Sequence, residues 1–288
     1  MAINEDLWIF TAQCPSRLGT VDVVTRALAE TENYVVAMNS YDDRATKSFS
    51  IRVELRPLKG EDSLERFRSI FGDRAAPFDM QWELTSPDHR PRVAILVSKF
   101  DHCLNDLLYR FRKGELAMDI PLIVSNHPDL KPLADWHGIP YFHLPITAET
   151  KPQQETELWR LIREYRCELV VLARYMQVLS PELAARLDGR AINIHHSLLP
   201  GFKGAKPYHQ AWEKGVKLVG ATAHYVNDDL DEGPIITQGV QPVDHGHYPE
   251  DLVAKGQDIE SQTLARAVRY HIEKRVFLHG NRTVVFPD

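Results

Sequence analysis

Residues 192–200 (INIHHSLLP) form the densest run of side chains that could carry chemistry. Asn193 and His195 lie two positions apart in this run, and at the end of a β-strand that spacing points both side chains to the same face. An amide and an imidazole that lie together can hydrogen-bond one carbonyl oxygen and stabilise it as it gains negative charge during nucleophilic attack. The pair could equally fix the loop that follows the strand, and this segment alone leaves both interpretations open.

A second segment, residues 224–234 (HYVNDDLDEGP), contains a cluster of acidic side chains. A carboxylate from this cluster beside His195 would orient the imidazole ring and favour its positively charged form. A solvated acidic loop between two strands is the alternative, and it is the commoner fate of such a run. The cluster consists of Asp228, Asp229, Asp231 and Glu232.

The pattern of residues 93–288 predicts strands that alternate with helices, and therefore an open, doubly wound, mostly parallel α/β sheet. Short apolar runs such as VAILV and LVVL are typical of strands that are buried on both faces. The predicted strands are 93–97, 121–124, a stretch near Tyr141, 169–172, 191–194, 216–226 and 234–243, and the predicted helices are 101–112, 156–165, 181–187 and 249–273. Active sites of such sheets lie beyond the carboxyl ends of the strands, where this assignment puts His195.

Residues 1–85 have a different order of predicted strands and helices, which indicates a separate ferredoxin-like βαββαβ domain with an antiparallel sheet. Two prolines and several charged residues in 86–92 predict a linker between the two domains. The predicted strands are 7–12, 34–41, 48–55 and 78–84, and the predicted helices are 18–31 and 64–71.

Composition excludes several classes of function. Lys and Arg number 34 and Asp and Glu number 40 among 288 residues, and a net charge of −6 argues against a nucleic-acid partner. No apolar run approaches the roughly 20 residues that a membrane span needs, and the amino-terminal residues MAINEDLWIF lack the pattern of a secretory signal. Three widely separated cysteines predict reduced thiols and therefore a cytoplasmic protein. The missing apolar run predicts that the protein has no membrane partner.

The joint pattern Asn193-x-His195, followed by SLLP at 197–200 and by His224-(x)6-Asp231-x-Gly233-Pro234, resembles the formyltransferase family that uses 10-formyltetrahydrofolate. The resemblance covers about residues 91–280 and implies a Rossmann-like catalytic domain. It assigns the catalytic roles to Asn193, His195 and Asp231. His224 matches a histidine that supports the catalytic groups in the related transferases.

The same resemblance implies where the folate binds. Residues 174–180 (RYMQVLS) match the family's folate segment, and the acidic loop matches a second pterin-binding segment. For Met176 and Leu179, ordinary core packing is the alternative. The implied folate-binding residues are Met176, Gln177, Val178, Leu179, Asn227, Asp228 and Asp229.

The amino-terminal half resembles an ACT domain through its element order and through Pro15-x-x-Leu18-Gly19, which opens the first helix. An ACT domain ahead of a formyltransferase domain is similar to the deformylase branch of the family. That branch implies hydrolysis of 10-formyltetrahydrofolate to formate and tetrahydrofolate, which supplies formate and balances one-carbon folate pools for purine biosynthesis, with no cofactor and no metal. The ACT resemblance implies a homo-oligomer and an amino-acid effector near Pro15, Leu18 and Gly19, with a purely structural dimerisation module as the alternative.

The choice of water as formyl acceptor depends on residues 98–104 (SKFDHCL), which follow the first strand of the second domain. The glycinamide ribonucleotide transferases of the family hold a phosphate on a glycine-rich loop there, whereas this loop has no glycine and carries an acid. The methionyl-tRNA formyltransferases have a further carboxyl-terminal domain, for which we expect no counterpart here. Lys99 or Lys203 could still hold an anionic acceptor, so a transferase that acts on an amine stays as the alternative.

Two further classes of protein differ more strongly from a folate-dependent hydrolase. A metal hydrolase could use His195, His196, His224 and Asp231, but their spacing matches no zinc pattern, and residues 244–247 (DHGH) are a weak metal motif that is more typical of a polar loop. The other rival is a non-catalytic amino-acid sensor built on the ACT-like half.

Overall fold

The computed structural model describes residues 7–201 and 207–287. The chain divides into two compact units. Unit 1 consists of Met1–His89, Lys274–His279 and Thr283–Asp288, and unit 2 consists of Arg90–Glu273 and Gly280–Arg282. The change of unit at His89 falls inside the expected linker, but the sequence prediction placed all of residues 93–288 in the second domain, whereas residues near the carboxyl end group with unit 1.

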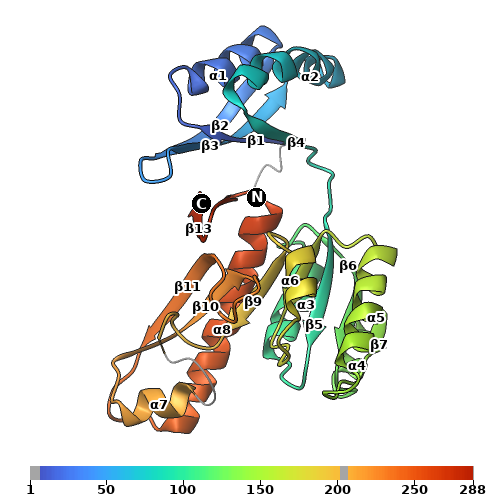
Figure 1. Ribbon diagram of the computed structural model, residues 1–288, viewed down its shortest axis with the longest axis vertical. Helices are drawn as coiled ribbons and strands as arrows, with labels where there is room; N and C mark the ends of the chain where they lie inside the picture. Colours follow the sequence, from blue (N-terminus) through green and yellow to red (C-terminus); the bar gives the residue numbers. More distant parts are fainter. Residues whose placement is uncertain (1–6, 202–206, 288) are drawn as a thin grey trace. The chain divides into compact units, whose positions relative to one another are not determined.

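Unit 1 confirms the predicted βαββαβ order and its antiparallel sheet. The sheet has the strand order β2-β3-β1-β4, and both helices lie on one of its faces (Figure 1). A short 3-10 turn, η1 (Ala76–Phe78), precedes the last strand of the four. The elements are β1 (Trp8–Pro15), α1 (Thr20–Glu30), β2 (Asn33–Asp43), β3 (Ser48–Pro57), α2 (Glu61–Ala75) and β4 (Gln81–Thr85).

Aromatic rings fill the space between this sheet and its helices. Phe10 on β1 meets Phe67 and Phe71 on α2 edge to face, with ring centroids 5.5 and 5.2 Å apart. All three side chains are fully buried. Alternate residues of β3 point into the same core, as the period of a strand requires, and they are Phe49, Ile51, Val53 and Leu55.

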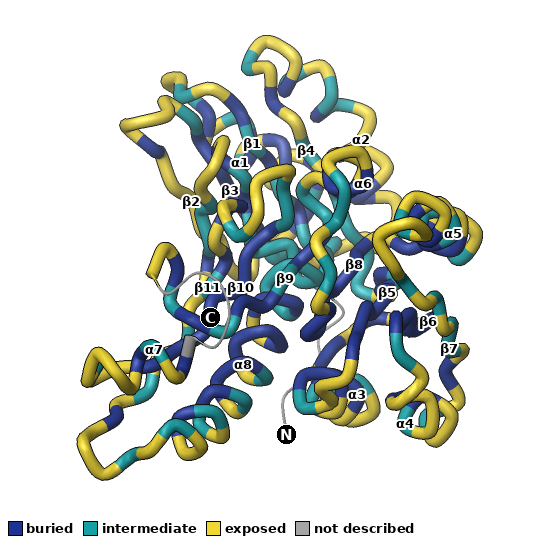
Figure 2. Tube along the Cα trace, turned by 60° about the horizontal axis from the view of Figure 1, so that its bottom comes forward, coloured by how far each residue is buried: buried dark blue, intermediate teal, exposed yellow. Residues whose placement is uncertain are grey.

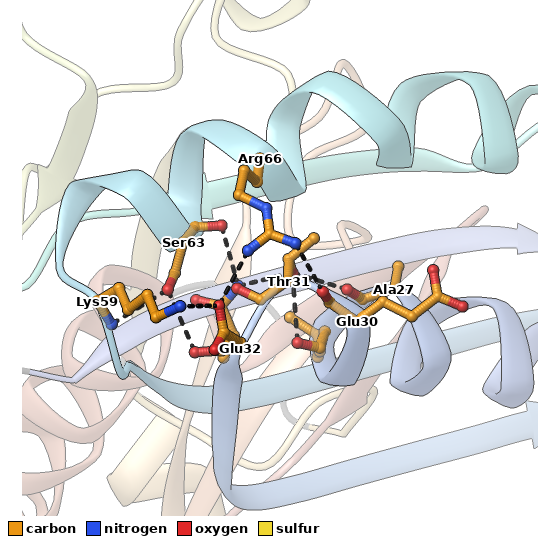
Figure 3. Close-up of polar contacts among 9 residues, drawn as sticks. Ala27, Glu30, Thr31, Glu32, Lys59, Ser63 and Arg66 are labelled. Atoms are coloured by element: carbon orange, nitrogen blue, oxygen red, sulfur yellow. Dashed lines mark hydrogen bonds and ion pairs between the residues drawn. The ribbon is translucent and has the colours of Figure 1, made fainter.

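The turn after α1 is held by α2, as Figure 3 shows. Glu32 has a left-handed backbone with φ of 57°, and its carbonyl oxygen accepts from the hydroxyl of Ser63 at 3.3 Å. Lys59 and Arg66 both pair with the Glu32 carboxylate at 2.9 Å. Because these ion pairs are exposed, each adds little energy, and the backbone contact sets the path into β2.

The strands that follow the last helix explain why the carboxyl end belongs to unit 1. The strands β12 (Val276–His279) and β13 (Arg282–Val285) form a two-stranded sheet. Gln13 donates to the Leu278 carbonyl at 2.9 Å, and the ring of the buried His279 lies 2.9 Å from the Ser50 hydroxyl. Burial of these polar groups against β1 and β3 satisfies their hydrogen bonds, as a buried polar group requires.

Unit 2 contains a seven-stranded sheet of order β11-β10-β9-β8-β5-β6-β7. Strands β5 to β9 are parallel, and β10 and β11 add to one edge in antiparallel fashion. This confirms the predicted mostly parallel sheet. The strands are β5 (Arg92–Val97), β6 (Asp119–Ser125), β7 (Tyr141–His143), β8 (Leu169–Leu172), β9 (Ala191–His195), β10 (Leu218–Tyr225) and β11 (Ile235–Pro242).

Helices cover both faces of this sheet. Leu158 on α5 and Leu183 on α6 pack against alternate residues of the central strands in one apolar cluster, while α3 packs against α8. In Figure 2 the central strands are buried and the outer surface of α5 is exposed. The sequence prediction omitted the short helices α4 and α7. The helices are α3 (His102–Lys113), α4 (Lys131–Trp136), α5 (Lys151–Glu164), α6 (Pro181–Arg186), α7 (Pro207–Glu213) and α8 (Pro249–Ile272).

Candidate active site

Asn193 and His195 lie at the carboxyl end of β9, and the antiparallel neighbour β10 brings His224 beside them. The register pairs Asn193 directly with His224 across the two strands, so the two side chains share a face. The Nδ1 atom of His224 donates to the Tyr225 carbonyl oxygen at 2.8 Å. Its Nε2 atom then accepts from Nδ2 of Asn193 at 3.2 Å, which leaves a second amide hydrogen on that nitrogen.

Asp231 places its carboxylate between the two histidines. One oxygen, Oδ2, lies 3.2 Å from Nδ1 of His195, and the other, Oδ1, lies 3.7 Å from Nε2 of His224. Burial by itself would raise the pKa of this carboxyl group, but the hydrogen bond from His195 and the proximity of the His224 ring outweigh it and hold the pKa well below its usual range. The group is therefore an anion at physiological pH and a weak base.

The loop that carries Asp231 depends on tight backbone geometry. Asp231 has a left-handed backbone with φ of 58°, which is uncommon for a residue other than glycine. Two residues later, a Cβ atom added to Gly233 would lie 1.8 Å from the carbonyl oxygen of Tyr225. Because only a residue without a side chain fits there, Gly233 brings the acidic loop back against β10.

His195 is buried, and its Nε2 atom has no hydrogen-bond partner among the described residues. The ring lines a pocket of about 270 Å³ in unit 2. An imidazole that is held by a carboxylate on one side and is unpaired on the other can donate to an oxygen that gains negative charge. The pocket also contains the second amide hydrogen of Asn193, so two donors lie at one place.

All of the sequence-predicted catalytic and folate-binding residues line this one pocket. The predicted residues that it brings together are Asn193, His195, His224, Asp231, Met176, Gln177, Val178, Leu179, Asn227, Asp228 and Asp229. Pro15, Leu18 and Gly19 belong to unit 1, where Leu18 is fully exposed and Gly19 has φ of 93° at the start of α1.

The segment after β8 is anchored at its start and its end. Met176 donates its backbone N–H to the Ser98 hydroxyl at 2.9 Å, and Ser98 donates to Asn126 at 2.7 Å. At the other end Ser180 donates its backbone N–H to Glu155 at 2.8 Å. These bonds fix the backbone at both ends of the segment 176–180.

The exposed apolar side chains of this segment face the pocket. Met176 and Val178 are 51% and 52% exposed, so core packing does not account for Met176. Leu179 packs against the core cluster of unit 2 and also lines the pocket. Together they offer an apolar surface for a flat ring, and backbone groups of the segment can meet a polar ring edge.

A buried charged network lies beside the pocket, and the sequence analysis did not find it. Arg174 has φ of 63°, and its Nε atom lies 3.3 Å from the carboxylate of Glu260, which is almost completely buried. The same carboxylate contacts His102 at 2.8 Å and the Tyr208 hydroxyl at 2.8 Å. No local pattern signals this network, because its members come from four distant segments.

The structure gives the rival metal sites little support. Within residues 7–201 and 207–287, the converging set of ligand types is His102, Cys103 and Glu260, and Arg174 and His102 already compensate the Glu260 charge. Asp244 accepts from the Gly246 N–H at 2.9 Å, which makes residues 244–247 a turn on the surface. Lys203 lies outside the described residues. No helix in the described ranges is long and apolar enough to cross a membrane.

Comparisons with known proteins agree with this geometry. The family model for formyl transferase matches residues 91–268. A formyltetrahydrofolate deformylase of Corynebacterium sp. is 53% identical over 96% of this chain and 97% of its own length. The crystal structure of a formyltetrahydrofolate deformylase from Pseudomonas putida is 65% identical, with a TM-score of 0.93 over 98% of this chain and 100% of that one.

A transferase also resembles part of the chain. The glycinamide ribonucleotide transformylase 1 of Symbiobacterium toebii is 30% identical, and its structure superposes with a TM-score of 0.66. It covers 69% of this chain and 95% of its own length.

The close contact at Gly233 leads to a test of the loop. We expect Gly233→Ala to lower the free energy of unfolding by about 1–3 kcal/mol, because the added methyl group overpacks a closed backbone contact. Chemical denaturation followed by circular dichroism measures the change. Gly72→Ala is the matched control, because a Cβ there meets nothing within 4 Å and alanine favours the helix. Equal stability of the two variants would contradict the assigned role of Gly233.

Proposed function

The chain belongs to the formyltransferase family and, within it, to the formyltetrahydrofolate deformylases, and from this premise we propose that it hydrolyses 10-formyltetrahydrofolate to formate and tetrahydrofolate. One observation carries the assignment of the site. The unpaired Nε2 atom of His195 and the amide of Asn193 face one pocket, and the carboxylate of Asp231 stands behind the imidazole.

We propose that the folate lies along two segments of this pocket. The pterin ring stacks on the exposed side chains of Met176 and Val178, with Leu179 beneath, and its polar edge meets backbone groups of the acidic loop. The loop residues in this role are Asn227, Asp228 and Asp229, which also line the pocket. The formyl group then reaches Asn193 and His195.

The donors act on the formyl oxygen. Water attacks the formyl carbon, and the oxygen becomes an anion that Asn193 and the charged ring of His195 stabilise. Asp231 keeps that ring charged and oriented, and one of its oxygens can hold the water. His224 acts through its neighbours, because it fixes the amide of Asn193. No cofactor or metal enters this scheme.

Water is the acceptor in this proposal because the groups after β5 are already engaged. The hydroxyl of Ser98 holds Met176 and Asn126, and the ring of His102 pairs with Glu260. Residues 98–104 also lack the glycines of a phosphate cradle. Transfer to an amine is the alternative.

We propose that unit 1 assembles subunits and senses a small molecule. Strand β2 pairs with β3 along one edge, and residues 36–42 are exposed along its other edge. An exposed strand edge is a template for pairing with a second copy. The backbone at Gly19, which starts α1 without a side-chain cap, is the proposed place for an amino-acid carboxylate near Pro15 and Leu18.

The reaction suits a cytoplasmic role in one-carbon metabolism. We propose that it supplies formate for purine biosynthesis and balances the folate pools. The three cysteines are free and buried, which suits a reducing compartment.

The catalytic roles can be tested by substitution. We expect His195→Ala to reduce formate release about 10²–10³-fold, because it removes a donor to the oxyanion. We expect Asp231→Asn to reduce formate release as well, because an amide cannot hold the charged ring. Folate binding, measured by calorimetry, should persist in both variants. Glu232→Gln, an exposed neighbour in the same loop, is the matched control. Normal turnover in either catalytic variant removes that residue from the mechanism.

The acceptor can be tested by competition. We expect purified protein to release formate from 10-formyltetrahydrofolate without any amine, because a positioned water needs no second organic site. Mass spectrometry then follows the formyl group after glycinamide ribonucleotide is added. Transfer of most formyl groups to the amine would replace the hydrolase by a transferase.

The role of unit 1 can be tested in solution. We expect the intact protein to be an oligomer by light scattering, and we expect Val36→Lys combined with Met38→Lys to shift it toward monomer because two charges oppose strand pairing. Tyr109→Lys, at another exposed side chain, is the control. Calorimetric titration with a panel of amino acids tests sensing. A monomeric parent protein contradicts the assembly, and the absence of heat from every amino acid contradicts the effector.

A further inference from the structure

The pocket contains a second imidazole, that of His196, for which the scheme above has no use. Its ring centroid lies 5.1 Å from that of His195, with 45° between the ring planes. The side chain is half-buried and lines the pocket together with Asn193 and His195. No residue in 7–201 or 207–287 forms a hydrogen bond with either ring nitrogen of His196. With respect to the described residues, the ring nitrogens of His196 are thus available to a ligand.

The charged groups around His196 differ from those around His195. Burial lowers the pKa of His196, and the positive charges of Arg174 and His195 lower it further, to about 4. Glu260 and Asp231 oppose this shift, and Glu260 is itself paired with Arg174 and His102. Tyr208 contributes a neutral ring whose centroid is 6.2 Å away. His196 is therefore uncharged near neutral pH and can accept a proton.

The position of Arg174 makes this environment permanent. Its guanidinium carbon lies 5.2 Å from the ring centre of Phe100, and its Nε atom faces the buried carboxylate of Glu260 at 3.3 Å. A cation that is held on two sides cannot turn away from the pocket, because the alternative leaves a buried charge without a partner. Arg174 and His196 line the same pocket, whereas the carboxylate of Asp231 contacts His195 directly.

We propose that His196 is the proton carrier of the hydrolysis: it takes the proton from the attacking water and gives it to the departing N10 atom of the folate. This inference rests on the proposed function and adds a catalytic residue to it. His195 keeps its proton throughout as the donor to the oxyanion.

The step balances as follows. The water oxygen forms a bond to the formyl carbon while one water proton moves to a ring nitrogen of His196. The product of this addition is a tetrahedral anion with one hydroxyl group, and its negative oxygen faces Asn193 and His195. The C–N10 bond then breaks, its electron pair stays on N10, and N10 takes the proton from His196. Formic acid and tetrahydrofolate result, and the acid releases its proton to solvent.

The acidity of His196 suits the leaving group. N10 is an arylamine nitrogen, whose lone pair is conjugated with the ring and is only weakly basic. A more acidic donor protonates such a nitrogen more readily, and burial, reinforced by the positive charge of Arg174, makes the charged form of His196 more acidic than an ordinary imidazolium. In this scheme the Nε2 atom of His195 is engaged by the oxyanion, and its Nδ1 atom by Asp231.

The test compares two substitutions at His196 with a matched control. We expect His196→Ala and His196→Asn to reduce formate release about 10²-fold, with unchanged folate binding by calorimetry, and we expect added imidazole to restore part of the activity of His196→Ala. His143→Ala, at an exposed histidine of unit 2, should behave like the parent protein. Formate release by the parent should also fall as the pH drops through about 4, because protonated His196 cannot accept the water's proton, and the residual activity of His196→Asn should lack this decline.

The outcomes separate this inference from the function on which it rests. Normal formate release by both His196 variants, while His195→Ala is impaired, overturns the proton carrier and leaves the hydrolase intact. Loss of folate binding in both variants, or the absence of rescue by imidazole, assigns His196 a structural role and also overturns the proposal. A parent protein that releases no formate contradicts the proposed function itself.

Discussion

The carboxylate of Asp231 between two imidazoles is the interaction on which the site depends. It contacts His195 at 3.2 Å and His224 at 3.7 Å, and through His224 it is linked to the amide of Asn193. The anion therefore orients the ring of His195, and His224, which the Tyr225 carbonyl holds, orients the amide of Asn193. A partly buried carboxylate is stable only where partners compensate its charge. The strands and the loop around Asp231 must therefore bring it to its partners.

A change of strand direction in the sheet brings Asp231 and the two histidines together. Five parallel strands bring their carboxyl ends to one edge, and β10 then runs antiparallel beside β9. His224 thereby arrives opposite Asn193, and the loop after β10 returns Asp231 to the same place. The close approach of Gly233 to Tyr225 completes the return. A purely parallel continuation would have carried the acidic loop away from β9 by a crossover helix.

The adjacent histidines show how one backbone can support two different chemical groups. His195 contacts a carboxylate, whereas His196 is half-buried, and burial together with the positive charge of Arg174 lowers its pKa. Neighbouring residues of the same type can differ in chemistry because burial and nearby charges act on each side chain separately. In the proposed hydrolysis one ring of such a pair stabilises the oxyanion while the other carries the proton from the water to the leaving group.

The sequence by itself determined the two-domain order, the parallel sheet and the residues that gather at the pocket. The fold follows from local patterns such as apolar runs of strand length, and the spacing of Asn193 and His195 made that pair a candidate, whereas the family resemblance selected Asp231 from the acidic run. The family resemblance added the pterin segments, since Met176 alone also suits a core position. Short elements such as α4 were omitted because six residues provide too little periodicity to separate a helix from a loop.

Tertiary structure decided the features that join distant segments. His102 and Glu260 meet although they are 158 positions apart, and Arg174 joins them from the end of β8. The strands near the carboxyl end similarly pack on β1 and β3 through Gln13 and His279. No local pattern can report such contacts, because a charge is stabilised by whatever the fold brings within a few ångströms of it. For the same reason the type and spacing of residues could identify His195 and His196 as candidates, but only the packed structure could distinguish their chemistry.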